Sequence, residues 1–254
     1  MHCIKFLLFV SILLSTVKAL PQSTLEKADQ LFEERCEVIQ DEKASSENID
    51  KAINLYSQST EEPERTIGLL KSYEFKASWT KVSEEEKRAL YEKAIELAKT
   101  KSVQFPDNGA IAYWHVANYA RWGDLIDITE AAQEGVIDEI KKLAEKAINL
   151  DKTYNQAGAL RLLGGIHLEA PTIPLILTWP SNEKAKQLLT EAYRIAPQHP
   201  ANAYLYAKML HIVGNDKKSN TIFQELIERE ERKHYFLVDQ KYIQKGKDYY
   251  EENF

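Results

Sequence analysis

Five side chains could form an anion-binding site if the fold brings them together. They are the cations Arg121, Arg161 and Lys208 and the phenols Tyr113 and Tyr204. A guanidinium binds a carboxylate through two parallel hydrogen bonds, and a tyrosine offers an apolar ring with a polar tip. This combination suits an anionic organic ligand or an acidic peptide segment. In the structural alternative, the cations pair with neighbouring Glu or Asp residues and the tyrosines belong to the core.

Motifs for catalysis or metal binding are missing from the sequence. It contains no H-E-x-x-H, G-x-S-x-G, C-x-x-C, phosphate-loop or dinucleotide-binding pattern. No histidine after residue 19 has a second histidine or a cysteine at the spacing of a local metal site. We therefore expect a protein that is not an enzyme and that uses no metal or cofactor.

The first residues have the pattern of a secretory signal peptide. Lys5 precedes the apolar run 6–14, and Val17 and Ala19 stand at the spacing of a cleavage site. The run is short for a membrane span, so a retained anchor is the weaker alternative. Cleavage after Ala19 would leave residues 20–254 as a single domain, periplasmic or secreted, without a membrane span.

The charge balance argues against nucleic acid as a partner. The whole chain has 33 basic and 39 acidic residues. Loss of residues 1–19 removes two lysines, which leaves 31 basic residues and a net charge of −8. An acidic protein repels polyanions, so we expect no nucleic-acid partner. The one remaining cysteine, Cys36, cannot form an internal disulfide, and we expect it to be buried as a small apolar residue.

The chain has the pattern of helices joined by short connections. Apolar residues recur at helical period, and Ser23 and Ser83 each precede a Glu by three residues, as in a capping box. The expected helices cover residues 24–40, 47–58, 63–79, 83–104, 108–121, 132–150, 155–169, 182–196, 200–213, 216–232 and 234–250. The predicted fold is all-α: an α-α superhelix of about five helical hairpins with a C-terminal capping helix.

A repeat near the C-terminus indicates the kind of superhelix. Small or apolar residues recur after 34 positions, in the pairs Ala185 and Ser219, Leu189 and Phe223, and Ala192 and Leu226. This period is typical of the tetratricopeptide repeat (TPR), and so are Leu163-Gly164 in one hairpin and Pro197 after another. In a TPR hairpin a small residue lets two helices approach, and we assign that role to Gly164. Stacked hairpins leave a concave groove.

The TPR pattern also predicts which residues face this groove. If Gly164 takes the eighth position of its repeat, Arg161 and Gly165 face the groove, and the missing side chain of Gly165 leaves room one turn after Arg161. The same reasoning applies to the neighbouring repeats. The predicted groove residues are Tyr113, Asn118, Arg121, Arg161, Gly165, Tyr204, Lys208 and His211.

An apolar, proline-rich segment interrupts the repeat. Gly164 and Ala207 are 43 residues apart, and the extra residues lie around 169–181. A second excess lies at 125–136. Long insertions in such arrays often carry function. Either the apolar residues of the first insertion form one wall of the groove, or they fold back as a structural cap; they are Ile173, Leu175, Leu177 and Trp179.

Four stretches of the chain resemble one family of TPR-like proteins. They are AYWHVANYARWG (112–123), KAINLD (146–151), GALRLLGGIHLEAP (158–171) and EAYRIAPQHPANAYLYAKML (191–210). Together they are similar to the T-component family of TRAP transporters, over about residues 50–230. The resemblance implies a periplasmic TPR-like protein associated with tripartite ATP-independent solute uptake.

Two functions therefore remain open. In the first, the protein is an exported scaffold that binds a partner protein, for which the resemblance implies a periplasmic solute-binding protein. In the alternative, it binds a small anionic or amphipathic organic ligand in the concave groove. A homo-oligomer is compatible with both.

Overall fold

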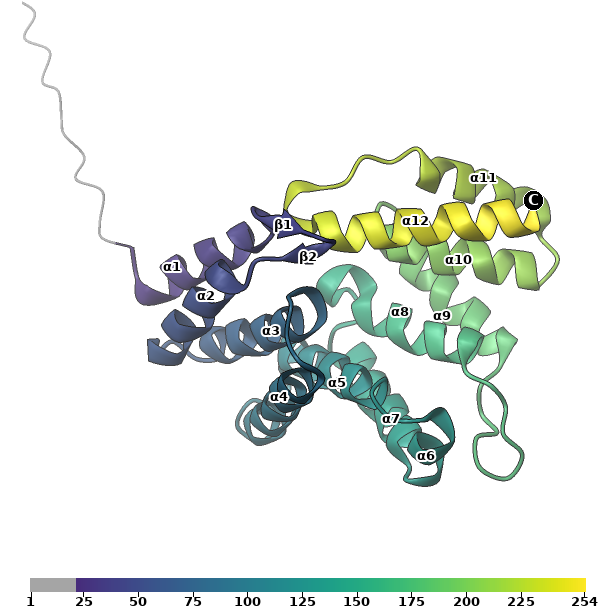
Figure 1. Cartoon of the computed structure of the whole chain (residues 1–254). Helices are drawn as coiled ribbons and strands as arrows, with labels where there is room; N and C mark the ends of the chain where they lie inside the picture. Colours follow the sequence, from purple (N-terminus) through teal and green to yellow (C-terminus); the bar gives the residue numbers. More distant parts are fainter. Residues whose placement is uncertain (1–21) are drawn as a thin grey trace, which may run out of the picture.

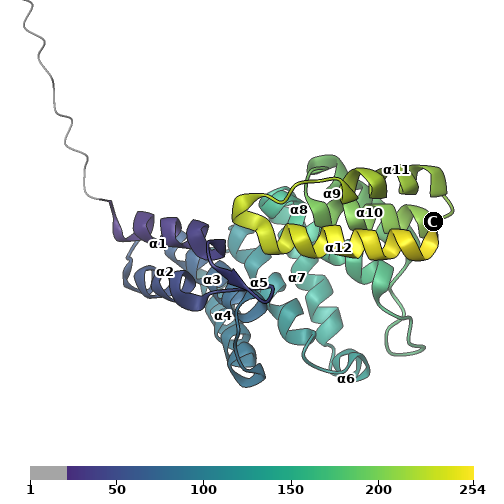
Figure 2. The same cartoon turned by 45° about the horizontal axis from the view of Figure 1, so that its top comes forward.

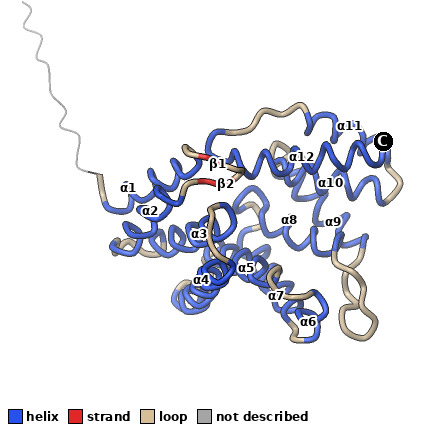
Figure 3. Tube along the Cα trace, viewed as in Figure 1, coloured by secondary structure: helices blue, strands red, loops and turns tan. Residues whose placement is uncertain are grey.

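The computed structural model describes residues 22–254 (Figure 1). The predicted signal peptide, residues 1–19, lies outside the described residues. The described part contains twelve α-helices and one two-stranded hairpin, so helix dominates (Figure 3). No helix within residues 22–254 combines the length and the apolar character needed to cross a bilayer.

Ten of these helices pair into five hairpins, which stack in chain order. The pairs are α1 (Thr24–Glu33) with α2 (Ser46–Gln58), α3 (Glu64–Trp79) with α4 (Glu84–Gln104), α5 (Gly109–Gly123) with α7 (Val136–Asp151), α8 (Tyr154–Glu169) with α9 (Asn182–Ile195), and α10 (Pro200–Ile212) with α11 (Asp216–Ile227). The last helix, α12 (Phe236–Asn253), follows them. The predicted all-α superhelix of hairpins with a terminal helix is confirmed.

Local capping explains why helices begin where the sequence predicts. Ser23 Oγ accepts a hydrogen bond from Glu26 N (3.1 Å), and Glu26 Oε2 accepts one from Ser23 N (2.8 Å). This capping box satisfies two amides that the helix leaves free. Ser83 caps α4 in the same way at 3.1 Å, but Glu86 pairs with Lys76 (2.9 Å) instead of closing a box.

The first helix is shorter than predicted. A 3₁₀ turn, η1 (Glu34–Cys36), and a hairpin of strands β1 (Ile39–Gln40) and β2 (Lys43–Ala44) replace the end of the helix predicted at 24–40. Asp41 and Glu42 form the hairpin turn with positive φ values of 50° and 58°. A right-handed helix cannot continue through that conformation.

Two other segments also differ from the prediction. The excess at 125–136 contains the short helix α6 (Ile128–Gln133), which Gly135 separates from α7 with a φ of 74°. The helix predicted at 216–232 ends at Ile227, and a second 3₁₀ turn, η2 (Lys233–Tyr235), leads into α12.

The repeat positions form the core between hairpins, as the period predicts. All six repeat residues, from Ala185 to Leu226, are completely buried. Gly164 has the packing role assigned to it, because a Cβ at this position would lie 2.7 Å from Leu189 Cδ2. Leu189 Cγ would lie at 2.8 Å as well, and real Cβ atoms essentially never show such distances, so Leu189 would have to move before a larger residue could replace Gly164.

The last helix covers the concave face of the superhelix (Figures 1 and 2). Ile243 and Gly246 of α12 are buried against the C-terminal hairpin, and Leu237 is buried in the core of the N-terminal hairpins. Arg35 of η1 also donates a hydrogen bond to His234 O (2.8 Å), just before α12. One helix therefore touches both ends of the array, which the sequence did not predict.

Candidate functional site

A cavity of about 520 Å³ lies between the concave face and α12. Residues of α3, α5, α8 and α10 line the side formed by the hairpins, and residues of α12 line the other side. Much of the wall is apolar or aromatic, as in Trp114, Leu162, Ile166, Leu205 and Tyr242. This size and lining are typical of sites for small organic molecules.

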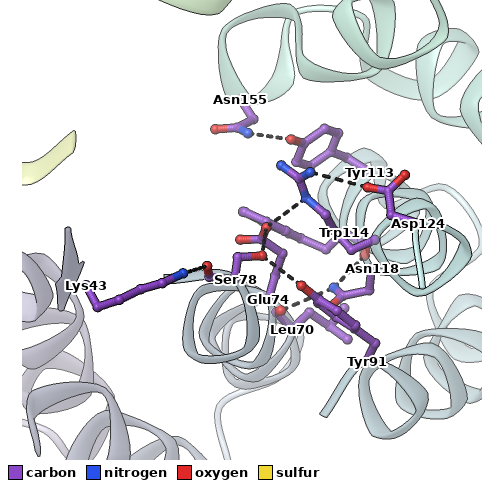
Figure 4. A network of polar contacts seen from close by, with 11 residues as sticks. Lys43, Leu70, Glu74, Ser78, Tyr91, Tyr113, Trp114, Asn118, Asp124 and Asn155 are labelled. Carbon is purple, nitrogen blue, oxygen red and sulfur yellow. Dashed lines mark hydrogen bonds and ion pairs between the residues drawn. The ribbon is translucent and has the colours of Figure 1, made fainter. Parts of the chain in front are cut away.

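The structure brings together five of the eight predicted groove residues. Those that line the cavity are Tyr113, Arg121, Arg161, Gly165 and Tyr204. Tyr113 and Tyr204 are mostly buried, and Tyr113 OH accepts a hydrogen bond from Asn155 Nδ2 (2.7 Å; Figure 4). Burial raises the pKa of Tyr204 to about 12, so its phenol is neutral.

Three predicted groove residues lie elsewhere. Asn118 is fully buried and its Nδ2 donates to Leu70 O (3.3 Å) and Trp114 O (2.8 Å), which ties α5 to α3 (Figure 4). Lys208 does not line the cavity, and its Nζ pairs with Oε1 of Glu169, which does (2.7 Å). Asn118 therefore has a structural role, and the charge of Lys208 is compensated.

His211 is also displaced from the predicted site. Its Nδ1 lies 2.9 Å from Asp216 Oδ1, and its ring packs against Tyr249 of α12 and against Phe254, the residue after that helix. The TPR pattern correctly places such residues on the first helix of a hairpin. The pattern contains no information about a helix that folds back over them.

The insertion after α8 does not form a wall of the cavity. Leu177 is buried in the core beside α7, and Trp179 Nε1 donates to Asp138 Oδ1 (2.7 Å). Ile173 pairs with Leu177 through the backbone (2.8 Å), and Leu175 at the tip is 99% exposed. Within residues 170–181 only Ala170 and Pro171 line the cavity. The insertion is a folded-back loop, and α12 takes the covering role instead.

Arg121 pairs with carboxylates, as in the alternative in which the predicted cations are compensated by neighbouring Glu or Asp residues. Its Nε lies 3.5 Å from Glu74 Oε1, and its Nη1 lies 3.5 Å from Asp124 Oδ2. Glu74 also accepts a hydrogen bond from Ser78 Oγ (2.8 Å), which is 2.9 Å from Tyr91 OH (Figure 4). Two carboxylates therefore compensate the charge of Arg121.

Arg161 differs from Arg121 because its partners are neutral. Its Nη1 donates to Gln156 O (3.0 Å) and to Asn202 Oδ1 (2.8 Å). No carboxylate within residues 22–254 forms an ion pair with it. A half-buried guanidinium with neutral partners keeps its full positive charge, and here that charge lies on the cavity wall.

A strained turn positions Arg161. Asn155, Gln156 and Ala157 have φ values of 48°, 56° and 64°, so a left-handed turn precedes the regular part of α8. Non-glycine residues rarely adopt this conformation, which costs roughly 1–2 kcal/mol for each residue. The turn directs Gln156 O toward Arg161 and Asn155 toward Tyr113. The sequence predicted an ordinary helix from residue 155 and missed this turn.

His199, at the N-cap of α10, is a further cavity residue that the sequence did not single out. It is 5% exposed, and its buried Nδ1 has no hydrogen-bond partner among the described residues. Desolvation, together with Arg161, Arg232 and Arg229, lowers the pKa of His199 to about 2. A neutral imidazole and the positive end of a helix dipole therefore lie beside the cavity, and both are compatible with an anion.

The wall also includes residues from the two ends of the chain. Arg35 is buried against Phe32 and donates to the carbonyl of Phe32 (2.7 Å), and Lys245 of α12 lies 5.8 Å from the ring of Tyr204. Cys36, next to Arg35 in the chain, is half-buried and also lines the cavity, and burial raises the pKa of its thiol. No local pattern marked these residues, because only the fold-back of α12 brings them to the cavity.

Comparison with solved structures identifies the class of fold. The chain is similar to a thermophilic TPR protein from Thermus thermophilus, with a TM-score of 0.57 and 14% sequence identity over 88% of this chain and 96% of that chain. No family model and no curated protein sequence matches the chain. The fold is thus TPR-like. The likeness does not extend to the T-component family.

Proposed function

We propose that this protein binds a small organic anion with an apolar body in the cavity beneath α12. The observation that carries the proposal is the guanidinium of Arg161, which lies on the wall with only neutral partners. The carboxylate of a bound ligand would supply the negative charge that the partners of Arg161 lack, and it would bind the guanidinium through two parallel hydrogen bonds. The aromatic and aliphatic wall would cover the rest of the ligand.

The position of α12 favours a small ligand over a peptide. Peptides that bind an open TPR groove need an uncovered concave face, and α12 covers that face here. The helix is firmly packed, since Leu237 and Ile243 are buried and a Cβ at Gly246 would lie 2.9 Å from Leu226 Cδ2. A peptide would have to displace these contacts, whereas a small molecule fits the cavity beside them.

Binding of carboxylic acids tests this proposal directly. Straight-chain acids from butanoate to hexadecanoate are compared with the alcohols of equal length, by thermal shift and then by calorimetry. We expect at least one acid to bind more tightly than its alcohol. Arg161→Met should weaken that binding about tenfold to a hundredfold, because a hydrogen bond to a charged group is worth about 1.5–3 kcal/mol.

Arg194 provides the matched control. It is a largely exposed arginine on α9, outside the cavity, so Arg194→Met should leave the affinity unchanged. Two results contradict the proposal: no acid in the series stabilises the protein, or Arg161→Met binds the acid as tightly as Arg194→Met does.

We also propose that the protein works outside the cytoplasm as an accessory component of a solute uptake system. The signal-peptide pattern of residues 1–19 and the four stretches similar to the T-component family support this role. A partner protein, such as a solute-binding protein, would then contact the outer surface. Fractionation of cells that produce the full chain with a C-terminal tag should recover the shortened chain outside the cytoplasm; recovery of the uncleaved chain in the cytoplasm contradicts export.

A further inference from the structure

Two adjacent glycines of α8 face different surroundings. A Cβ at Gly164 would overlap Leu189, whereas a Cβ at Gly165 would meet only Leu205 Cδ1, at an ordinary contact distance of 3.6 Å. Gly165 lies on the cavity wall, one turn after Arg161. Packing therefore requires a glycine at position 164 but not at position 165.

The backbone does not require glycine at position 165 either. Gly165 has no positive φ, unlike Gly135 and Gly214. Glycine is a poor helix former, so alanine at position 165 would give a more stable helix. What glycine does provide is free space in the cavity. A residue that lowers stability while it enlarges a site is expected where function demands the space.

The two ends of the α8 face that lines the cavity carry different side chains. Arg161 lies at one end, Gly165 and Ile166 lie in the middle, and Glu169 lies at the far end. The cation at that far end, Lys208, is already paired with Glu169 (2.7 Å). On this face of α8 a ligand therefore finds the guanidinium of Arg161 without a carboxylate partner, followed by an apolar strip that ends at Glu169. Arg35 and Lys245 line the cavity from η1 and α12.

From this arrangement we infer that Gly165 determines ligand specificity. It leaves room for the straight apolar body of an amphipathic monoanion whose carboxylate binds Arg161. The inference rests on the proposed function, because it assigns the class of ligand to the same cavity. Acids with a second carboxylate at the far end, or with bulk close to the first, should bind more weakly.

Decanoate and decanedioate test the inference on the full chain by calorimetry. The wild-type protein should bind decanoate at least tenfold more tightly than decanedioate. Gly165→Leu should weaken decanoate binding at least tenfold without lowering the melting temperature, because its side chain extends into the cavity. Gly165→Ala should raise the melting temperature by about 1–4 °C. Gly164→Ala is the matched control and should lower it.

The outcomes separate this inference from the proposed function. If Arg161→Met loses decanoate binding and Gly165→Leu keeps it, the role of Gly165 is refuted and the proposed function stands. The same holds if Gly165→Leu lowers the melting temperature as much as Gly164→Ala does, because packing would then explain the glycine. If the wild-type protein binds none of the acids, both proposals fail.

Discussion

Removal of the Asn202 side chain should weaken the fold and the cavity wall together. Asn202 is completely buried, and its Nδ2 donates to the carbonyls of Gln156 (3.1 Å), Ala192 (3.0 Å) and Ala196 (3.0 Å). Its Oδ1 accepts the hydrogen bond from Arg161 (2.8 Å). One amide thus joins the start of α8, the end of α9 and the site cation.

The expected loss follows from these bonds. The three carbonyls each keep another donor, since Ala196 N, His199 N and Arg161 Nη1 also bond to them. We therefore assign the bonds to carbonyls the low value of about 0.5 kcal/mol each. The hydrogen bond from Arg161 involves one charged group. Because its acceptor is neutral, we assign it the low end of the range for hydrogen bonds to charged groups, about 1.5 kcal/mol. Asn202→Ala should lower the free energy of unfolding by about 2–4 kcal/mol.

Urea unfolding followed by circular dichroism measures this change. Asn54→Ala serves as the control, because Asn54 is exposed on α2 and should change the unfolding free energy by less than about 0.5 kcal/mol. Asn202→Ala should also weaken decanoate binding, although Asn202 does not line the cavity. A loss below about 1 kcal/mol with unchanged decanoate affinity would show that Asn202 neither joins these elements nor positions Arg161.

Two further predictions concern the insertion and the pH dependence of stability. Leu177→Ala should lower the unfolding free energy by about 2–4 kcal/mol because it leaves a cavity beside α7. Leu175→Ala at the exposed tip should change it by less than about 0.5 kcal/mol. Equal effects of the two substitutions in urea unfolding would contradict a loop that Leu177 anchors to the core. His199 is neutral in the native state because its pKa is lowered to about 2, but it takes up a proton in the unfolded state below about pH 6.5. Its contribution to stability therefore falls by about 1.4 kcal/mol for each pH unit below that value. His199→Gln should reduce the loss of unfolding free energy between pH 6.5 and pH 5. An unchanged slope of unfolding free energy against pH would refute a neutral buried imidazole.

Local interactions explain what the sequence predicted well. The start of α1 depends on a hydrogen bond between residues three positions apart. The core between the hairpins is formed by residues that recur every 34 positions, which can be read directly from the sequence. Gly164 could be assigned because a TPR hairpin needs a small residue at that position. Where a positive φ decided the geometry, as at Asp41 and in the turn from Asn155, the helical period gave no warning.

The sequence by itself therefore determined a superhelix of five hairpins, the close approach at Gly164 and a set of side chains suited to an anion. Only the tertiary structure decided which of the three predicted cations lacks a carboxylate partner. Arg121 meets Glu74 from another hairpin, whereas Arg161 meets the neutral Asn202, 41 residues away. The tertiary structure also decided that α12 lies over the groove and leaves a cavity beneath it, through contacts such as Arg35 with His234, 199 residues apart. Periodicity reports on neighbours within a few turns, and charge compensation and enclosure depend on partners far along the chain.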